Sequence, residues 1–504
     1  MRKHIKLIVA YLLISIPFIY LASEIDFWHN DEWIYYPQII KILHGDFTLH
    51  PLMAPTFYSV GVIASLFSIL FGISNLPYLT AIITISSCFI LNLILIKHYK
   101  LNFIDSVLLS LLVFFNPLII FTSMGFLTDN YFLFFCLLSI YFIYEFNEKS
   151  ILKNFILINI FIILAYFTRQ LGLVISLAFF FNVLKSKNFK YALIQGLAFL
   201  LLTMFHFFLF PKTGEMLETK FVFSNITYFR YIFSLGYVVL VYLGLFMIPL
   251  LVISILKSSL TKKNILVLLC LTTIVLVFMY FYFNNIGWIG EKLYYLKYTL
   301  NTNGFFVENL HGSKESFSLK NGLYCFLEIF TKFISVFSIL LLLRKKKLKI
   351  DFNLFFIIIY FLTLLISVKV YDRYLIPLLP VVLFFLIHKD FKMKTLHRFN
   401  VGIFILLLGF YSYNFAADYV ITNNYVWNKA NSIEEINKGE IVATDAWRYL
   451  YPSIKDGHLY KFTYDKPSMK NYGADYILVD SKNIKYPLNI WNNKNTVYLY
   501  KYKF

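Results

Sequence analysis

Long apolar segments alternate with short polar stretches along this chain of 504 residues. The first apolar segment runs from Ile5 to Leu21 and follows the basic residues Arg2 and Lys3. A run of about 20 apolar residues is long enough to cross a bilayer as an α-helix. The succession of such runs predicts an all-α polytopic membrane protein with about 13 transmembrane helices.

Basic clusters separate alternate apolar segments. They are Lys97–Lys100, Lys185–Lys190, Lys257–Lys263, Arg344–Lys347 and His388–Arg398. Because loops rich in lysine and arginine stay in the cytoplasm, the clusters predict a cytoplasmic N-terminus. Among the spans that this orientation predicts are Leu76–Ile96, about Val107–Thr122, Tyr131–Phe146 and Val401–Ala417. It also predicts a long external loop from about Asn284 to Asn321.

The stretch between Leu21 and Leu76 is rich in acids, as expected of an external loop. Within it, Trp33–Leu43 is predicted to be a short interfacial helix. Pro55–Phe71 is just long enough to span the membrane, but no basic residue follows it. We interpret Pro55–Phe71 as a second interfacial or re-entrant helix, because the next span then ends at a basic cluster.

The tail has a different composition from the rest of the chain. It is polar, and Tyr476–Asp480 and Thr496–Tyr500 alternate in the manner of β-strands. We therefore predict two domains, a transmembrane catalytic domain of residues 1–417 and a small extracytoplasmic α/β domain of residues 418–504.

The composition supports membrane insertion and excludes other classes. Hydrophobic residues make up 59% of the chain and charged residues 14%, which excludes an ordinary soluble protein. The net charge of +19 does not indicate nucleic-acid binding, because the lysines lie in clusters between apolar segments. The four cysteines stand alone inside apolar segments, without the spacing of a metal site.

Two adjacent acids, Asp31 and Glu32, follow the first apolar segment and lie between Trp28 and Trp33. A carboxylate at the membrane interface beside aromatic rings is partly desolvated, which makes it more basic. The simpler alternative is a helix start, with Asn30 or Asp31 as the N-cap and the acids in the first turn complementing the helix dipole.

The predicted topology gathers further polar residues on the same external face: Asp129, Arg169, Gln170, Glu291, His311 and Arg373. Ionisable side chains at the ends of membrane helices are costly, which makes them functional candidates. Simpler alternatives are a helix cap for Asp129, a lipid headgroup or structural ion pair for Arg169, and an exposed position for His311. For Arg373, the simpler alternative to a functional role is a local ion pair with Asp372.

The order of these features resembles that of the GT-C glycosyltransferases that use polyprenyl-phosphate sugars. These include protein O-mannosyltransferases, lipid A aminoarabinose transferases and the dolichyl-phosphate-glucose α-1,2-glucosyltransferase. The motifs that carry the resemblance are Asp31-Glu32-Trp33-Ile34-Tyr35-Tyr36-Pro37-Gln38, Thr128-Asp129, Arg169-Gln170 and Arg373-Tyr374-Leu375-Ile376-Pro377-Leu378-Leu379-Pro380. The first three are similar to motifs of the glucosyltransferase, and the last is similar to an element of bacterial members. The polar tail resembles bacterial members and departs from the glucosyltransferase, so neither glucose nor its acceptor is carried over.

The resemblance implies an inverting displacement on the external face of a bacterial cell membrane. The donor would be a polyprenyl-phosphate-linked monosaccharide, and the acceptor a hydroxyl group on a lipid or glycan. Asp31 would be the general base, with Glu32 and Asp129 orienting the acceptor or binding a divalent cation, the one candidate cofactor. Arg169 and Arg373 would bind the donor phosphate. Side chains that contact the sugar, the acceptor or the covering loop would be Gln170, Tyr35, Glu291 and His311.

Two other classes share parts of this pattern. A polymerase or ligase of surface polysaccharide would use a diphosphate-linked donor and would also have a large external loop. A transporter or lipid flippase should have charges near the bilayer midplane, or broken helices in two related halves. No internal repeat is evident in the sequence, which disfavours the transporter.

Overall fold

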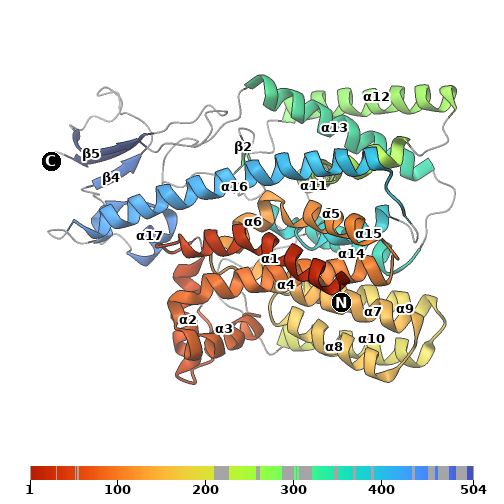
Figure 1. Ribbon diagram of the computed structural model, residues 1–504, viewed down its shortest axis with the longest axis horizontal. Helices are drawn as coiled ribbons and strands as arrows, with labels where there is room; N and C mark the ends of the chain where they lie inside the picture. The colour runs from red at the N-terminus through yellow and green to blue at the C-terminus, as the bar shows by residue number, and fades with distance from the viewer. Residues whose placement is uncertain are drawn as a thin grey trace.

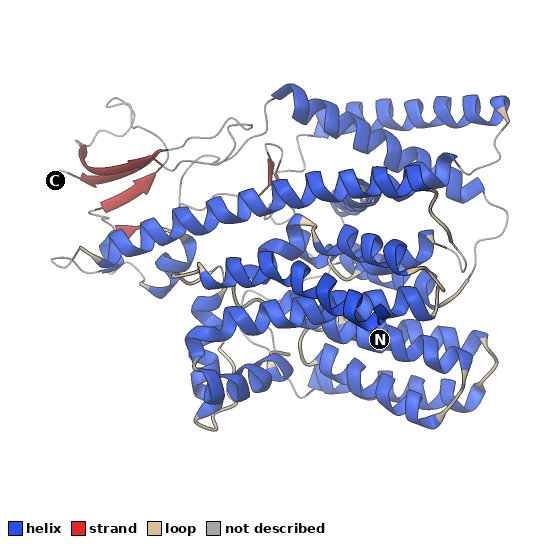
Figure 2. Ribbon diagram, in the orientation of Figure 1, coloured by secondary structure: helices blue, strands red, loops and turns tan. Residues whose placement is uncertain are grey.

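The computed structural model describes residues 2–29, 31–50, 53, 56–208, 226–256, 261–286, 300–301, 304–305, 321–344, 350–366, 370–387, 391–433, 438–451, 460–463, 476–483 and 496–502. Most of these residues are helical, and a small β-sheet lies near the C-terminus (Figure 2). The helices run roughly along the longest axis of the molecule (Figure 1).

The N-terminal part consists of two long helices joined by two short ones. Helices α1 (Arg2–Ser23) and α4 (Leu76–Lys97) are long, whereas α2 (Glu32–Leu43) and α3 (Tyr58–Phe71) are short and pack against each other. The prediction of two short helices between two long ones is thus confirmed. With 14 residues, α3 is only about 21 Å long, shorter than the roughly 30 Å hydrocarbon core of a bilayer.

The predicted span Val107–Thr122 is not one straight helix, because the chain forms two helices there, which together are apolar and long enough for one broken span. Helices α5 (Phe103–Phe114) and α6 (Pro117–Met124) meet at an angle of 68°. The proline that begins α6 disfavours helical geometry at Asn116 and cannot donate a backbone hydrogen bond. The Asn116 side chain caps α6 by accepting an amide of its first turn at 2.9 Å.

The remaining helices form layers around this N-terminal part. They are α7 (Thr128–Glu148), α8 (Leu152–Tyr166), α9 (Gly172–Lys185), α10 (Phe189–Phe208), α11 (Ile226–Leu256), α12 (Lys262–Ile286), α13 (Asn321–Arg344), α14 (Phe352–Ile366) and α15 (Leu378–Leu386). A one-turn helix, η3 (Asp372–Leu375), precedes α15. Helix α7 packs between α4 and α8, and α11 packs on α13 (Figure 1).

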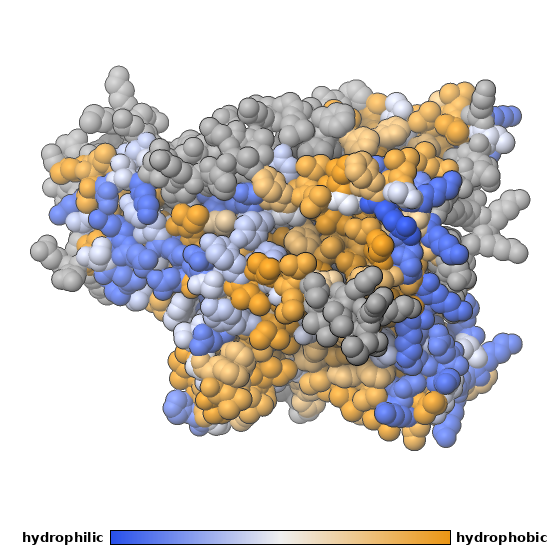
Figure 3. All heavy atoms as spheres, viewed as in Figure 1, coloured by the Kyte–Doolittle hydropathy of each residue, from blue (hydrophilic) through white to orange (hydrophobic). Residues whose placement is uncertain are grey.

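Within the described residues, five helices are long and apolar enough to cross a membrane, or six if the bent pair of α5 and α6 is one span. The five segments are Ile73–Lys97, Thr128–Glu148, Phe189–Phe207, Leu235–Leu256 and Thr395–Asn431. Several other apolar helices are shorter, so the expected number of about 13 spans stays a prediction. Hydrophobic side chains cover the middle of the molecule and hydrophilic ones gather towards its two ends (Figure 3). The chain is an integral membrane protein.

Helix α16 (Thr395–Asn431) is the longest helix described, with 37 residues. Its length of about 55 Å exceeds what a bilayer requires, and it continues beyond the predicted end at Ala417. The predicted domain boundary at Asp418 therefore lies inside a continuous helix. Near its start, the Arg398 guanidinium contacts the buried Asp105 carboxylate of α5 at 2.6 Å.

The C-terminal part contains a four-stranded sheet. Its strands are β3 (Ile441–Val442), β4 (Tyr460–Thr463), β5 (Tyr476–Asn483) and β6 (Thr496–Tyr502), in the order β3-β4-β6-β5. β3 and β4 are parallel and the other pairs antiparallel, so both predicted strands are confirmed. Two further short strands, β1 (Leu300–Asn301) and β2 (Gly304–Phe305), pair with each other.

Aromatic contacts join this C-terminal part to the rest. Helix α17 (Asp445–Leu450) contacts α2, and the ring of Tyr449 stacks on that of Trp33 with centroids 4.7 Å apart. Trp447 is fully buried, and its ring meets that of Trp427 in α16 at 5.0 Å.

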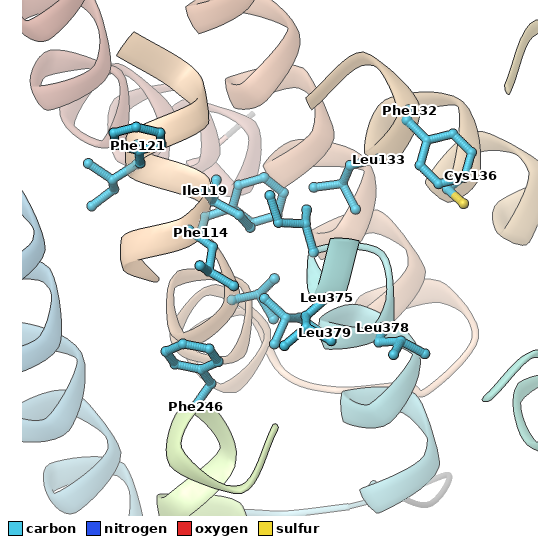
Figure 4. Packing of buried hydrophobic residues seen from close by; sticks show 14 of the residues in the cluster. Phe114, Ile119, Phe121, Phe132, Leu133, Cys136, Phe246, Leu375, Leu378 and Leu379 are labelled. Carbon is cyan, nitrogen blue, oxygen red and sulfur yellow. The ribbon is translucent and has the colours of Figure 1, made fainter. Parts of the chain in front are cut away.

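The core beneath η3 fixes one of the candidate residues. Leu375 and Leu379 lie among side chains of α5 and α6, including Phe114 and Ile119 (Figure 4). The Tyr360 hydroxyl of α14 also donates a hydrogen bond to the Tyr374 carbonyl at 2.7 Å. Arg373 is thus held by apolar packing on its C-terminal side and by a buried hydrogen bond to its neighbour.

Candidate active site

Two acids and two arginines from four separate elements meet at one place, and we call these residues the charged cluster: Asp31, Asp129, Arg169 and Arg373. An Arg169 Nη2 atom lies 2.8 Å from Asp129 Oδ2, and Arg373 Nη2 lies 2.9 Å from Asp31 Oδ2. Arg373 Nε is also 3.9 Å from Asp129 Oδ2, which connects the two pairs. The side chains of Asp129 and Arg373 are 3% and 6% exposed, whereas that of Asp31 is 33% exposed.

The two acids occupy the starts of two helices. Asp31 directly precedes α2, and Asp129 lies in the first turn of α7. Carboxylates at these positions are stabilised by the positive end of the helix dipole. Neither acid caps its helix through its side chain, because Asp31 makes no capping hydrogen bond and the N-cap residue of α7 is Leu127. Their side-chain partners are instead the two arginines.

Arg169 lies in the tight turn between α8 and α9. A side chain at Gly172 would collide with the backbone of Tyr166 and come within 2.8 Å of the Ala165 carbonyl carbon, so the close turn requires glycine. The turn directs Arg169 towards α7, where its guanidinium also donates to the Thr128 hydroxyl at 3.0 and 3.2 Å. With its ion pair to Asp129, Arg169 is thus oriented by two consecutive residues of α7.

Aromatic rings flank both guanidinium groups. The Arg373 guanidinium lies 4.7 Å from the ring centroid of Tyr371, and that of Arg169 lies 5.1 Å from the ring centroid of Tyr374. Such cation–π contacts favour the charged guanidinium in a desolvated site. The sequence analysis did not predict either tyrosine as a site residue. Their positions on either side of Arg373 in the sequence could have indicated contacts with a guanidinium group.

The electrostatic balance of the charged cluster keeps both arginines charged. Burial alone would lower the pKa of Arg169 and Arg373, but the adjacent carboxylates outweigh it and raise the pKa of both guanidinium groups. Tyr35 stacks on Phe57 beside the charged cluster, and burial together with the Asp31 charge raises the pKa of its hydroxyl. At neutral pH Tyr35 is therefore an uncharged hydrogen-bonding group.

Glu32 points away from the charged cluster and is 1% exposed. Its Oε2 accepts a hydrogen bond from the His29 backbone amide at 2.6 Å, and its Oε1 accepts one from the Phe126 backbone amide. Burial raises the pKa of Glu32 to about 8, since desolvation outweighs the two amide hydrogen bonds. Burial likewise lowers the pKa of His29 to about 3, so its imidazole is neutral at physiological pH.

The two candidate metal ligands do not fit a divalent cation. Glu32 is engaged by backbone amides, and Asp129 lies between two guanidinium groups. Such cations instead require oxygen or nitrogen atoms that converge on one empty position. We therefore derive no step through a metal at the charged cluster.

One group of metal-binding side chains does lie close together in the described part of the chain: His98, Glu145 and Glu148. It belongs to the C-terminal ends of α4 and α7, whereas the charged cluster lies at the start of α7. The 21 residues of α7 separate the two places by about 30 Å.

The structure brings together most of the predicted site residues. Asp31, Asp129, Arg169 and Arg373 contact one another, and Tyr35 lies beside them. Gln170 is exposed in the turn that carries Arg169. The remaining two, Glu291 and His311, lie outside the described residues.

Comparison with known proteins gave one likeness. No protein-family model matches the chain, and no curated protein matches its sequence. Among solved structures, the chain is similar to the crystal structure of ArnT from Cupriavidus metallidurans bound to undecaprenyl phosphate. The two share 10% sequence identity with a TM-score of 0.41, over 88% of this chain and 68% of that one. A likeness of this size does not decide the reaction.

Proposed function

We propose that the chain is a membrane glycosyltransferase of the GT-C type. It would move a sugar from a polyprenyl-phosphate-linked monosaccharide to an acceptor hydroxyl on the external face of a bacterial cell membrane. The observation that carries this proposal is that two largely desolvated arginines lie together at the ends of helices, one of them in contact with a partly exposed carboxylate. A lipid-linked phosphate and a hydroxyl nucleophile require this combination of charges.

The arginines suit the phosphate of the donor. A guanidinium group presents parallel N–H donors that match two oxygens of a phosphate, and its charge persists when it is buried. Arg169 and Arg373 approach the same Asp129 oxygen, at 2.8 and 3.9 Å, so both can reach one anion.

Asp31 is the acid that an acceptor can reach. Its side chain is 33% exposed, whereas Asp129 is 3% exposed and already pairs with Arg169. In the reaction, the acceptor oxygen forms a bond to the anomeric carbon while the bond from that carbon to the phosphate oxygen breaks. The bonding electrons leave with the phosphate, where the arginines stabilise the charge, and the hydroxyl proton passes to Asp31.

The resting contact between Asp31 and Arg373 suggests an order of binding. Arg373 Nη2 is 2.9 Å from Asp31 Oδ2, so an arriving phosphate competes with Asp31 for this guanidinium. Once the phosphate has taken Arg373, the Asp31 carboxylate is free to accept a proton. The donor would accordingly bind before the acceptor reacts.

A donor assay in proteoliposomes tests the proposed function. The purified protein is given a radiolabelled polyprenyl-phosphate monosaccharide, or the same lipid carrying a diphosphate-linked oligosaccharide. We expect loss of sugar from the monophosphate donor and none from the diphosphate. Turnover of the diphosphate donor alone would support a polymerase or ligase, and movement of either lipid across the bilayer without bond cleavage would support a flippase.

The external position of the site can be tested by cysteine labelling. In a background with the native cysteines replaced by serine, the exposed positions Glu24→Cys and Ser432→Cys should react with a membrane-impermeant maleimide in intact cells. The matched control, Lys187→Cys, lies in a predicted cytoplasmic loop and should react only after permeabilisation. The reverse pattern would place the charged cluster on the cytoplasmic face.

A further inference from the structure

Glu32 is the acid next to the proposed base, but its contacts differ from those of Asp31. Its Oε2 atom accepts the backbone amide of His29, three residues earlier, at 2.6 Å. Its Oε1 atom accepts the backbone amide of Phe126, 94 residues later in the chain. With 1% of its surface exposed, the carboxylate is committed to these two amides and cannot meet an acceptor in solvent.

These two amides belong to the segments that carry the two acids of the charged cluster. His29 lies two residues before Asp31, and Phe126 lies three residues before Asp129. Glu32 therefore connects the start of α2 to the start of α7 through a single carboxylate. Both hydrogen bonds are buried, and losing one leaves a buried amide unpaired.

Gly125 lies against the same contact, where there is no room for a side chain. Its backbone φ is −112°, so the conformation itself does not require glycine. A Cβ atom there would instead collide with Glu32 Oε1 and come within 2.8 Å of His29 side-chain atoms. The absence of a side chain at position 125 lets the loop between α6 and α7 approach the carboxylate closely.

Aromatic packing on both sides of the contact strengthens this connection. Phe126 meets Tyr35 and Tyr36 of α2 edge to face, with ring centroids 6.0 and 6.3 Å apart, and Tyr131 of α7 at 5.6 Å. The carboxylate hydrogen bonds thus operate within a rigid apolar contact between α2 and α7.

We infer that Glu32 is a positioning residue that sets the separation of Asp31 and Asp129, and with it the place of the base relative to the two arginines. This inference rests on the proposed function for its catalytic consequence, but the connection itself does not. It assigns Glu32 neither to the acceptor nor to a metal. Small displacements of reacting groups are costly, so such a residue can affect turnover strongly without touching a substrate.

Amide hydrogen exchange tests the connection without reference to any reaction. In Glu32→Gln, the amide nitrogen would have to face one backbone N–H, so one of the two hydrogen bonds is lost. We expect the segment containing Phe126 to exchange at least about tenfold faster than in the wild type. The control Glu24→Gln replaces an exposed acid of the same loop and should leave exchange unchanged. Unchanged exchange at Phe126 in Glu32→Gln would overturn the inference.

A second variant approaches the same contact from the opposite side. Gly125→Ala should displace the Glu32 carboxylate and speed exchange in the same segment. Its control, Gly402→Ala, places a methyl group where nothing lies within 4 Å. Faster exchange after both alanine substitutions would indicate a general loss of stability and would contradict the inference.

Steady-state kinetics test the catalytic consequence. Glu32→Gln should lower kcat by about 10- to 100-fold with little change in the KM of the donor. In an Asp31→Asn background the same substitution should change the residual rate by less than about twofold, because Glu32 acts through Asp31. An equal loss in both backgrounds would show a merely structural role. If the wild type turns over no polyprenyl-phosphate sugar, the proposed function fails, and the exchange data still decide the role of Glu32.

Discussion

Asp31→Asn should lower kcat by about 100- to 10,000-fold, the range expected for removal of a general base. Asparagine keeps the size of the side chain and can still accept a hydrogen bond from Arg373, but it cannot take a proton from the acceptor hydroxyl. Donor binding should therefore persist, because both arginines remain in place. The measurement is single-turnover transfer from a radiolabelled donor by purified protein.

The matched control for this variant is Asp26→Asn. Asp26 lies in the same loop and is exposed, and the contact that anchors it, at 2.9 Å to Asn424, uses its backbone amide. This control should retain wild-type turnover. If Asp31→Asn is nearly as active as the control, Asp31 is not the base, and the proton acceptor must be sought at Asp129 or Glu291.

Arg373→Ala should cost about 2–4 kcal/mol of transition-state stabilisation, which corresponds to a loss of roughly 30- to 1,000-fold in kcat/KM. Arg373 contacts both acids, at 2.9 and 3.9 Å, so its removal also takes a positive charge from beside two carboxylates. Arg169→Ala should have a smaller effect on Asp31, because its ion pair is with Asp129. The measurement is kcat/KM for the donor, together with the yield of folded protein in detergent.

Lysine at position 373 should restore only part of the activity, since it keeps the charge but loses the paired N–H donors of the guanidinium group. Arg448→Ala, at an exposed position of α17, is the matched control and should behave as the wild type. Full activity of Arg373→Ala would assign this arginine a structural role and remove the main support for phosphate binding.

The sequence predicted much of the charged cluster because its residue types are rare in such an apolar chain. Asp31, Asp129, Arg169 and Arg373 stand out as ionisable groups at the ends of apolar segments, and the charge pattern of the loops put them on one face. Which arginine pairs with which acid could not be predicted. Asp31 and Arg373 are 342 positions apart, and only the packing of η3 between other helices brings them together.

The residue type of Glu32 did not predict its contacts. The sequence predicted that Asp31 is the base and that its neighbour Glu32 orients the acceptor or binds a cation. Side chains of adjacent helical residues point about 100° apart, and in the fold this turns Glu32 towards the loop before α7. The role of that loop depends on a contact between residues 94 positions apart, which no local pattern records.

Helix boundaries were predicted least well where a proline or a mixed composition obscures the hydrophobic period. The bend after α5 was missed because the apolar character continues through the Asn116-Pro117 step. The true end of α16 was missed because its last turns combine polar residues with Trp427 and Val426, which are buried. Burial of a polar helix face against another part of the chain is a tertiary effect that hydropathy does not reveal.

The continuity of α16 also bears on how this protein can be divided. Beyond the expected boundary at Asp418, the helix supplies Tyr419 to the buried His29 and Asn424 to the loop at Glu24 and Asp26. These contacts hold the segment from which the proposed base projects. Through these contacts, the part of α16 beyond Asp418 packs against the loop that precedes α2. A chain cut at Asp418 would lose the outer support of its own catalytic loop.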